Sequence, residues 1–214
     1  MRTDPEGAGR LMSRWLYALG KAFFTVIFAV FYRWDVRGRE NVPREGPVLL
    51  CANHFDWWDP PLVGTAAPRP VFFMAKEELF RYPVLGTLLP KVGAFPVRRG
   101  TPDRRALRAA LDLLAQGQVV GIFPEGTRSR DGRLLPAQPG AAMLAVRSRA
   151  PVVPVAIAGP YRLFRPIRVR FGEPFELTEY YDRRLSNDAL LEAGARIMER
   201  IRRLLPPEQG GAAE

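Results

Sequence analysis

Four short, continuous apolar runs alternate with helical patterns along this chain, and this alternation restricts the fold more than any other sequence feature. Uninterrupted apolar runs of this length are typical of strands buried on both faces of a sheet. The runs are VLLCA at 48–52, VFFMA at 71–75, VVGIF at 119–123 and VVPVAIA at 152–158. Helical patterns lie between or after them at 59–67, 101–118, 139–149 and 186–207. The order predicts an α/β fold, with a mostly parallel mixed sheet covered by helices.

Three weaker segments complete the expected architecture. Residues 92–97 are expected to be extended, and residues 76–90 to form a short helical piece broken by Pro83. Residues 167–171 alternate in polarity, which predicts a half-exposed or edge-like strand. Asp59 is expected to be the N-cap of the helix at 59–67, with Pro60 in its first position. In such sheets, functional sites lie on loops beyond the carboxyl ends of the strands.

The amino-terminal segment is apolar, aromatic and basic. Lys21 divides it, and the uninterrupted stretch 22–32 is shorter than the roughly 20 residues that a spanning helix needs. A signal peptide is disfavoured because acidic residues stand at the start and no small-residue cleavage site comes after the apolar stretch. We expect an interfacial helix or helical pair, with a core helix of a soluble domain as the alternative. The aromatic residues expected to enter the acyl boundary are Trp15, Phe23, Phe24, Phe28 and Phe31.

The chain is expected to have three parts. Residues 1–35 form the membrane-associated helical segment, residues 36–207 the main domain and residues 208–214 a disordered tail. The turn-rich stretch 37–47 separates the amino-terminal segment from the first apolar run of the main domain.

Charge and cysteine content narrow the function classes. The chain has 32 Lys and Arg against 22 Asp and Glu, giving a net charge of +10. This excess favours a polyanionic partner, namely nucleic acid, an anionic lipid surface or a phosphorylated substrate, with a solvated Arg-rich surface as the alternative. No nucleic-acid-binding motif is recognisable, so we expect no nucleic acid partner. Cys51 is the only cysteine, and we expect it to be a buried core residue rather than a nucleophile.

The only histidine stands in the stretch CANHFDWWDP, directly after the first apolar run. Asp59 follows His54 after four intervening residues, so a turning loop brings its carboxylate to one imidazole nitrogen. That pairing would fix the tautomer, stabilise the imidazolium and leave the other nitrogen as a base. The alternatives are a structural histidine and an aspartate that only caps its helix. A metal site is disfavoured because the chain has no second histidine and no standard ligand spacing.

Three further polar segments follow the other strand-like runs: GAFPVRRG at 93–100, IFPEGTRSRDG at 122–132 and VVPVAIAG at 152–159. With NHFDWWD, they form four ordered blocks of the types N-H-x4-D, G-x-F-x-x-x-R, F-P-E-G-T-R and V-P-V. In these blocks the chain resembles the glycerolipid acyltransferases of the 1-acyl-glycerol-3-phosphate acyltransferase (PlsC-like) type. The resemblance spans about residues 36–175.

The resemblance implies an α/β acyltransferase domain preceded by a membrane-associated helical segment. It implies transfer of an acyl group from a thioester, on acyl carrier protein or coenzyme A, to the hydroxyl of lysophosphatidic acid, giving phosphatidic acid. No metal and no cofactor beyond the thioester co-substrate are expected. The partners would be membrane lipids, at the cytoplasmic face of the cell membrane. His54 would be the general base and Asp59 its orienter. The residues implied in acceptor binding are Lys76, Arg99, Glu125, Gly126, Thr127 and Arg128.

The residue chemistry agrees with this reaction. An alcohol needs a base as it attacks, whereas the thioester is already activated, so no nucleophilic Ser or Cys is required. Arginine offers a fork that matches phosphate, whereas an ionised Glu125 only accepts hydrogen bonds; we expect it to meet a substrate hydroxyl or to hold Arg128. Oxyanion donors are expected near Gly93 or in the turn 124–126.

Two features of the blocks leave substrate preference open. Residues 137–139 lack the Phe and Lys that often precede the glycine of the family, which bears on acceptor or acyl-chain preference. Trp57 and Trp58 either line the lipid entrance or pack in the core. Acylation of another lyso-lipid acceptor is therefore one alternative function. A non-catalytic lipid-binding protein is a second alternative.

Overall fold

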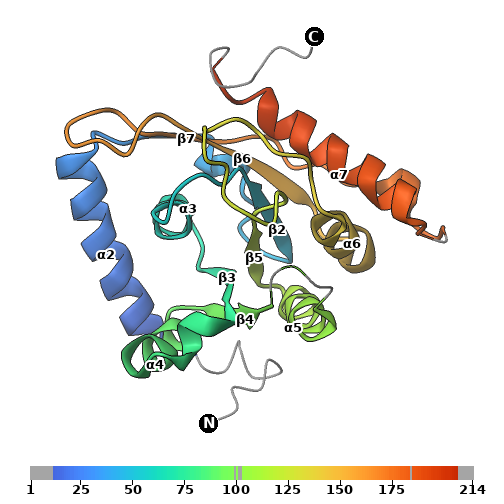
Figure 1. Ribbon diagram of the computed structural model, residues 1–214, viewed down its shortest axis with the longest axis horizontal. Helices are drawn as coiled ribbons and strands as arrows, with labels where there is room; N and C mark the ends of the chain where they lie inside the picture. The colour runs from blue at the N-terminus through green and yellow to red at the C-terminus, as the bar shows by residue number, and fades with distance from the viewer. Residues whose placement is uncertain (1–11, 99, 101–102, 184, 207–214) are drawn as a thin grey trace.

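A seven-stranded sheet forms the centre of the computed structural model, which describes residues 12–98, 100, 103–183 and 185–206 (Figure 1). The strand order is β1-β7-β6-β2-β5-β3-β4, and every neighbouring pair is parallel except β6 and β7. The strands are β1 (Asp35–Arg37), β2 (Val48–Ala52), β3 (Val71–Lys76), β4 (Ala94–Val97), β5 (Val119–Ile122), β6 (Val152–Ala158) and β7 (Arg168–Phe171). The expected α/β fold with a mostly parallel mixed sheet is confirmed.

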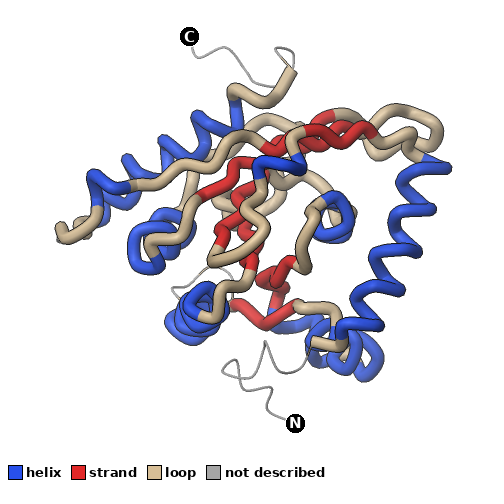
Figure 2. The backbone as a smooth tube through the Cα atoms, turned by 180° about the vertical axis from the view of Figure 1, so that it is seen from behind, coloured by secondary structure: helices blue, strands red, loops and turns tan. Residues whose placement is uncertain are grey.

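Helices cover both faces of the sheet (Figures 1 and 2). One face carries α5 (Arg104–Ala115), α6 (Pro139–Ser148) and α7 (Asn187–Arg202), and the other carries α2 (Arg14–Phe31) and α3 (Asp59–Ala66). Helix α4 (Pro83–Lys91) lies near the start of α2, where the N–H of Ser13 donates to the carbonyl of Lys91 at 2.9 Å. Short 3-10 helices are also present at Arg39–Asn41, Glu77–Arg81 and Thr178–Tyr180.

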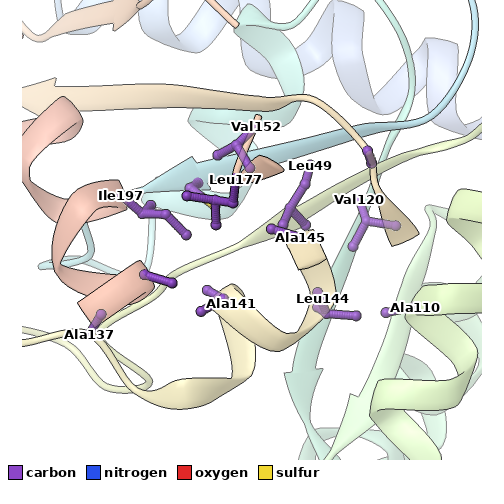
Figure 3. Close-up of a cluster of buried hydrophobic side chains, with 14 of the residues drawn as sticks. Leu49, Ala110, Val120, Ala137, Ala141, Leu144, Ala145, Val152, Leu177 and Ile197 are labelled. Carbon is purple, nitrogen blue, oxygen red and sulfur yellow. The ribbon is translucent and has the colours of Figure 1, made fainter. Parts of the chain in front are cut away.

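Strand β2 is buried along its whole length because both of its faces are covered. Leu49 and Cys51 join the hydrophobic cluster on the side of α5, α6 and α7, whereas Leu50 and Ala52 join the cluster on the side of α2 and α3. Figure 3 shows the first cluster, in which strand and helix side chains meet. Alternate side chains thus reach two cores, which explains why the apolar run is continuous.

The strand at 168–171 is half-exposed, which is the first of the two alternatives that its alternation predicts, and it does not lie at the sheet edge. β1 pairs with it in parallel, with Asp35 opposite Arg168, and takes the edge. The guanidinium of Arg170 fixes this pair by donating to the carbonyl of Asp35 at 2.8 Å and to its carboxylate. A strand of three residues is too short to show a periodicity in the sequence, so β1 was not predicted.

Helix α2 presents two different faces. Its inner face packs on α3: the Tyr17 hydroxyl donates to the carbonyl of Gly64 at 3.2 Å, Lys21 Nζ donates to the carbonyl of Ala67 at 2.5 Å, and Phe28 is fully buried. The expectation that Phe24 and Phe28 enter the lipid is therefore wrong, because both pack against the core. The outer face exposes a stripe of large apolar side chains at Trp15, Leu19, Phe23, Val26 and Val30.

Within the described part of the chain, α2 is the one helix whose length and composition would allow it to cross a membrane. Its inner contacts nevertheless hold it along the domain, as Figure 1 shows. The division of the chain at residues 35 and 207 stays a prediction, and the expected tail at 208–214 lies outside the described residues.

Candidate active site

The candidate site lies at the carboxyl ends of the central strands. Parallel register places Cys51 opposite both Ile122 of β5 and Pro154 of β6, so the loops after these strands leave the sheet at one edge. The polar blocks that follow β2 and β5 therefore meet, although they are distant in sequence. This edge is the usual position of a site in a parallel α/β sheet.

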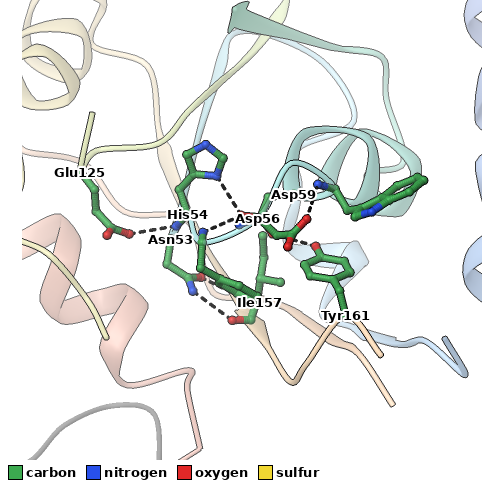
Figure 4. A network of polar contacts seen from close by, with 9 residues as sticks. Asn53, His54, Asp56, Asp59, Glu125, Ile157 and Tyr161 are labelled. Carbon is green, nitrogen blue, oxygen red and sulfur yellow. Dashed lines mark hydrogen bonds and ion pairs between the residues drawn. The ribbon is translucent and has the colours of Figure 1, made fainter. Parts of the chain in front are cut away.

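His54 and Asp59 form a buried pair in this loop cluster (Figure 4). His54 Nδ1 lies 2.8 Å from Asp59 Oδ2, and the two side chains are 5% and 0% exposed. The same oxygen accepts hydrogen bonds from the N–H groups of Phe55 at 2.7 Å and Asp56 at 2.8 Å. A carboxylate at Nδ1 selects the tautomer whose proton is on Nδ1, which leaves Nε2 as the acceptor.

Asp59 is not the helix cap that the sequence predicts. It is the first residue of α3, Trp58 occupies the N-cap position, and no side-chain cap bond is formed. Pro60 is therefore the second residue of α3, whereas the sequence predicts it in the first position. The Asp59 carboxylate instead points back to the preceding loop, where it binds His54 Nδ1 and the N–H groups of Phe55 and Asp56. Its position at the helix start also favours its negative charge.

The ring of Phe123 stacks on the His54 imidazole, with ring centroids 4.0 Å apart and an interplanar angle of 20°. Phe123 follows β5 directly and stacks in turn on Phe73 of β3. The imidazole is thus fixed by a flat apolar surface on one side and by a carboxylate at one nitrogen. Such fixation removes rotational freedom before a substrate arrives.

Glu125 lies beside the pair and holds main-chain atoms. Its side chain accepts from the N–H of His54 at 2.9 Å through Oε1 and from the N–H of Leu135 at 3.1 Å through Oε2. Glu125 is buried, and burial raises the pKa of its carboxyl to about 7, partly opposed by these two hydrogen bonds. Each Glu125 oxygen accepts from a backbone N–H group rather than from Arg128, and the expected contact with a substrate hydroxyl stays a prediction.

Arg128 lies over the exposed ring of Trp57, with its guanidinium carbon 3.9 Å from the ring centroid. The pair joins the third block to the loop between His54 and Asp59. Gly126 adopts a φ of +70°, and a Cβ there would lie 3.0 Å from Gln138 Cγ, so the turn requires glycine. Gly126 and Thr127 are exposed at this turn. Trp58 packs against Phe24 and Phe28, which is one of the two expected alternatives, whereas a lipid-entrance role for the exposed Trp57 stays a prediction.

Comparison with known proteins agrees with this geometry. The sequence model of a family described as Acyltransferase matches residues 33–158. The 1-acyl-sn-glycerol-3-phosphate acyltransferase of Bacillus subtilis (strain 168) is 34% identical over 151 residues, which are 68% of this chain and 75% of that protein. The chain belongs to the acyltransferase family. It is an enzyme of the PlsC-like type that the sequence motifs predict.

Two further comparisons bear on this acyltransferase. The crystal structure of the 1-acyl-sn-glycerophosphate (LPA) acyltransferase PlsC from Thermotoga maritima is similar with a TM-score of 0.67 at 30% identity, over 88% of this chain and 76% of that one. A lyso-ornithine lipid O-acyltransferase of Pseudomonas aeruginosa is 36% identical over 133 residues, covering 58% of this chain and 48% of that protein.

One predicted phosphate ligand of the acyltransferase lies at the carboxyl end of β3. Lys76 is the last residue of β3, is exposed, and forms an ion pair of 3.3 Å with Glu78. Arg99 lies outside the described residues, although Arg98 next to it directly follows β4. The strand register places this edge of the sheet on the same side as His54.

The two expected sources of oxyanion donors fall at opposite edges of the sheet. Gly93 precedes β4, so it lies at the amino ends of the strands, and its N–H donates to the carbonyl of Pro90 at 3.2 Å. Gly93 is therefore wrong as an oxyanion donor. The turn 124–126 lies at the correct edge, but the N–H of Gly126 donates to the carbonyl of Phe123 at 3.0 Å.

Cys51 is fully buried in β2, and burial raises the pKa of its thiol far above the usual range. A thiol held in its neutral form is a poor nucleophile, which agrees with its expected role as a core residue. In the part of the chain that the structure describes, no three metal-ligating side chains come together.

Three supporting residues were not predicted. Asn53 bonds both backbone groups of Ile157 through its side-chain amide, at 2.7 and 3.0 Å, and so ties the start of the loop to β6. Ser129 donates its N–H to the carbonyl of His54 at 2.7 Å. The hydroxyl of Tyr161 donates to Asp59 Oδ1 at 2.7 Å. Asn53 is adjacent to the histidine in the first block, but nothing in the sequence around Tyr161 indicates its contact.

Proposed function

We propose that the enzyme transfers a fatty acyl group from an acyl thioester to the free hydroxyl of lysophosphatidic acid, giving phosphatidic acid in phospholipid biosynthesis. The observation that carries the proposal is the buried His54–Asp59 pair at 2.8 Å, which leaves Nε2 as the acceptor. A non-catalytic lipid-binding protein would have no need of a buried, fully bonded carboxylate behind its only histidine.

The proposed reaction is a direct transfer. The acceptor hydroxyl oxygen attacks the thioester carbonyl carbon while His54 Nε2 takes the hydroxyl proton. Asp59 stabilises the imidazolium through Nδ1. Collapse of the tetrahedral intermediate breaks the carbon–sulfur bond, and the imidazolium returns its proton to the departing thiolate. The products are the diacylated lipid and the free thiol of acyl carrier protein or coenzyme A.

The acceptor phosphate would meet basic side chains around the turn 125–128. Arg128 is held over Trp57 within the loop cluster, and its planar guanidinium matches two phosphate oxygens. Lys76 would add positive charge from the end of β3, and Arg99 would add a further positive charge. Gly126 and Thr127 would allow close approach of the phosphate to the turn. Glu125 would act on the acceptor only indirectly, by holding the main chain of His54.

The enzyme would work as a peripheral or monotopic protein at the cytoplasmic face of the cell membrane. The outer stripe of α2 carries only apolar side chains, and the helix contains no acidic residue. The same helix is joined to a second exposed apolar segment, because the N–H of Phe164 donates to the carbonyl of Phe31 at 2.6 Å. Leu163 and Phe164 are both more than 60% exposed and are flanked by Arg162 and Arg165. This arrangement suits an anionic lipid surface.

A lyso-ornithine lipid is the second candidate acceptor, because a relative named for that activity is 36% identical over 133 residues. An acyl-transfer assay on the purified enzyme separates the candidates, with lysophosphatidic acid, other lysophospholipids and lyso-ornithine lipid as acceptors, and acyl carrier protein or coenzyme A as carrier. We expect the highest kcat/KM with lysophosphatidic acid. A higher value with an acceptor lacking the phosphate monoester would contradict the proposed substrate.

A further inference from the structure

The two oxygens of the Asp59 carboxylate have different partners. Oδ2 accepts from His54 Nδ1 and from the N–H groups of Phe55 and Asp56, all within the loop 54–59. Oδ1 accepts from the hydroxyl of Tyr161 at 2.7 Å, and Tyr161 lies 102 residues away in sequence (Figure 4). The loop 54–59 therefore supplies the hydrogen-bond donors to Oδ2, and a segment beyond β6 supplies the donor to Oδ1.

The hydrogen bond to Oδ1 is important because Asp59 is fully buried. A buried carboxylate is costly unless its oxygens are hydrogen-bonded. A donor on Oδ1 also fixes rotation of the carboxylate about its own axis. Oδ2 then stays directed at Nδ1, as the base requires.

Tyr161 is itself held in place. Its ring packs against Phe55 with centroids 5.5 Å apart and against Tyr32 at 6.0 Å, edge to face. Burial and the neighbouring Asp59 raise the pKa of the Tyr161 hydroxyl well above its ordinary value, so the hydroxyl keeps its proton. Tyr161 is thus a permanent donor to the carboxylate.

We propose that Tyr161 is a positioning residue of the acyltransferase, which holds Asp59 so that Asp59 can hold His54. The inference rests on the proposed function, and it adds a third residue to the His54–Asp59 pair. Tyr161 acts through Asp59 and does not contact the substrate.

The inference predicts the direction of a pH effect. The Tyr161 hydrogen bond is stronger when the carboxylate faces a neutral imidazole than when an imidazolium already neutralises it, so it favours the unprotonated pair. Removing the hydroxyl should therefore raise the pH at which the pair takes up a proton. The other ionisable groups that face this network are Asp56, Tyr32 and Glu125, and they stay unchanged in the test.

The test compares Tyr161→Phe with the wild-type enzyme, using Tyr180→Phe as the control. Phenylalanine keeps the ring that packs on Phe55 and Tyr32, and Tyr180 is a buried tyrosine in a 3-10 turn that does not contact the pair. His54 is the only histidine, so one imidazole signal in NMR reports its pKa without any substrate.

For Tyr161→Phe we expect the His54 titration midpoint to rise. We also expect kcat to fall about tenfold, with the KM for the acceptor unchanged. Tyr180→Phe should match the wild type in the His54 titration midpoint, in kcat and in KM. An unchanged midpoint, a loss seen only in KM, or failure of Tyr161→Phe alone to fold would overturn the inference. A wild-type enzyme inactive on every acceptor would count against the proposed function and leave the titration result standing.

Discussion

The backbone N–H of His54 donates to the side chain of Glu125 at 2.9 Å, and this contact joins two segments that are 71 residues apart in sequence. The N–H of Ser129 completes the link by donating to the carbonyl of His54 at 2.7 Å. Glu125 also binds the N–H of Leu135, so it holds the long loop after β5 against the loop after β2. The first and third sequence blocks are therefore one structural unit, in which the position of the imidazole depends on the conformation of both.

Stability should depend on pH through Glu125. Its carboxyl has a pKa of about 7 in the folded protein against an ordinary value of 4.5, so the folded state binds the extra proton between these values. Stability therefore falls as the pH rises from about 4.5 through 7, by at most about 3 kcal/mol. Chemical denaturation at a series of pH values measures this slope.

Glu125→Gln should flatten the slope, because glutamine does not titrate, whereas Glu173→Gln at an exposed position should leave it unchanged. Acidic groups whose pKa is lowered in the folded protein, such as Asp35 and Asp103, also stabilise the fold. They lose this stabilisation only at pH values below the range in which Glu125 titrates. A slope that survives in Glu125→Gln would show that another group carries it.

Asp59→Asn should reduce kcat by about 10²- to 10⁴-fold, because the amide cannot stabilise the imidazolium that forms on His54. Rates of acyl transfer and thermal unfolding should be measured together, since Asp59 also accepts two backbone hydrogen bonds. Asp112→Asn, on the exposed side of α5, is the matched control and should keep wild-type turnover. Turnover of Asp59→Asn within about threefold of wild type would contradict the role of the pair.

Trp57→Ala should raise the KM for a phosphate-bearing acceptor about two- to fivefold, because an exposed cation–π contact is worth about 0.5–1 kcal/mol. The KM of Trp57→Phe should stay close to the wild-type value, since phenylalanine keeps an aromatic face for Arg128. Arg128→Ala should raise the KM further, and Trp57→Ala should add little in that background. Additive effects of the two substitutions would show that Trp57 does not act through Arg128.

Membrane binding should depend on the outer stripe of α2. Trp15→Glu combined with Phe23→Glu should weaken co-sedimentation with anionic vesicles at least tenfold, because each buried aromatic side chain contributes about 1.5–3 kcal/mol. Leu191→Glu, at an exposed leucine on α7, is the control and should bind normally. Equal sedimentation of all three proteins would exclude the stripe as the membrane contact. Deleting the helix is a poorer test, because Phe28 belongs to the core.

The fold was largely predictable because the central strands are short apolar runs and the helices carry clear periodicity and caps. Asp103 and Ser186 cap α5 and α7 through their side chains, for example, and both are residues that favour this position. The unpredicted strand β1 and the wrong placement of Phe28 have separate causes. The three-residue β1 carries no periodicity, and the two faces of α2 are both apolar, so composition does not distinguish the core-facing Phe28 from the exposed Phe23.

The site was predictable where its residues are close in sequence. A loop of four residues between His54 and Asp59 restricts their separation, so the contact follows from spacing. The partners of Asp59 and His54 from other loops, Tyr161 and Phe123, depend on the order of β5, β2 and β6 in the sheet. Glu125 was identified by its motif but not by its contacts, because a sequence does not show which main-chain N–H groups a buried carboxylate will meet.

The most direct test of the account is the rate of acyl transfer to lysophosphatidic acid by His54→Gln. Glutamine can occupy the site but cannot act as a base, so we expect a loss of about 10²- to 10⁴-fold or more in kcat. The unfolding temperature and vesicle binding should stay close to wild type, because the contacts of the His54 backbone with Glu125 and Ser129 remain. Turnover by folded His54→Gln within a few-fold of wild type would contradict the central claim that this imidazole is the base.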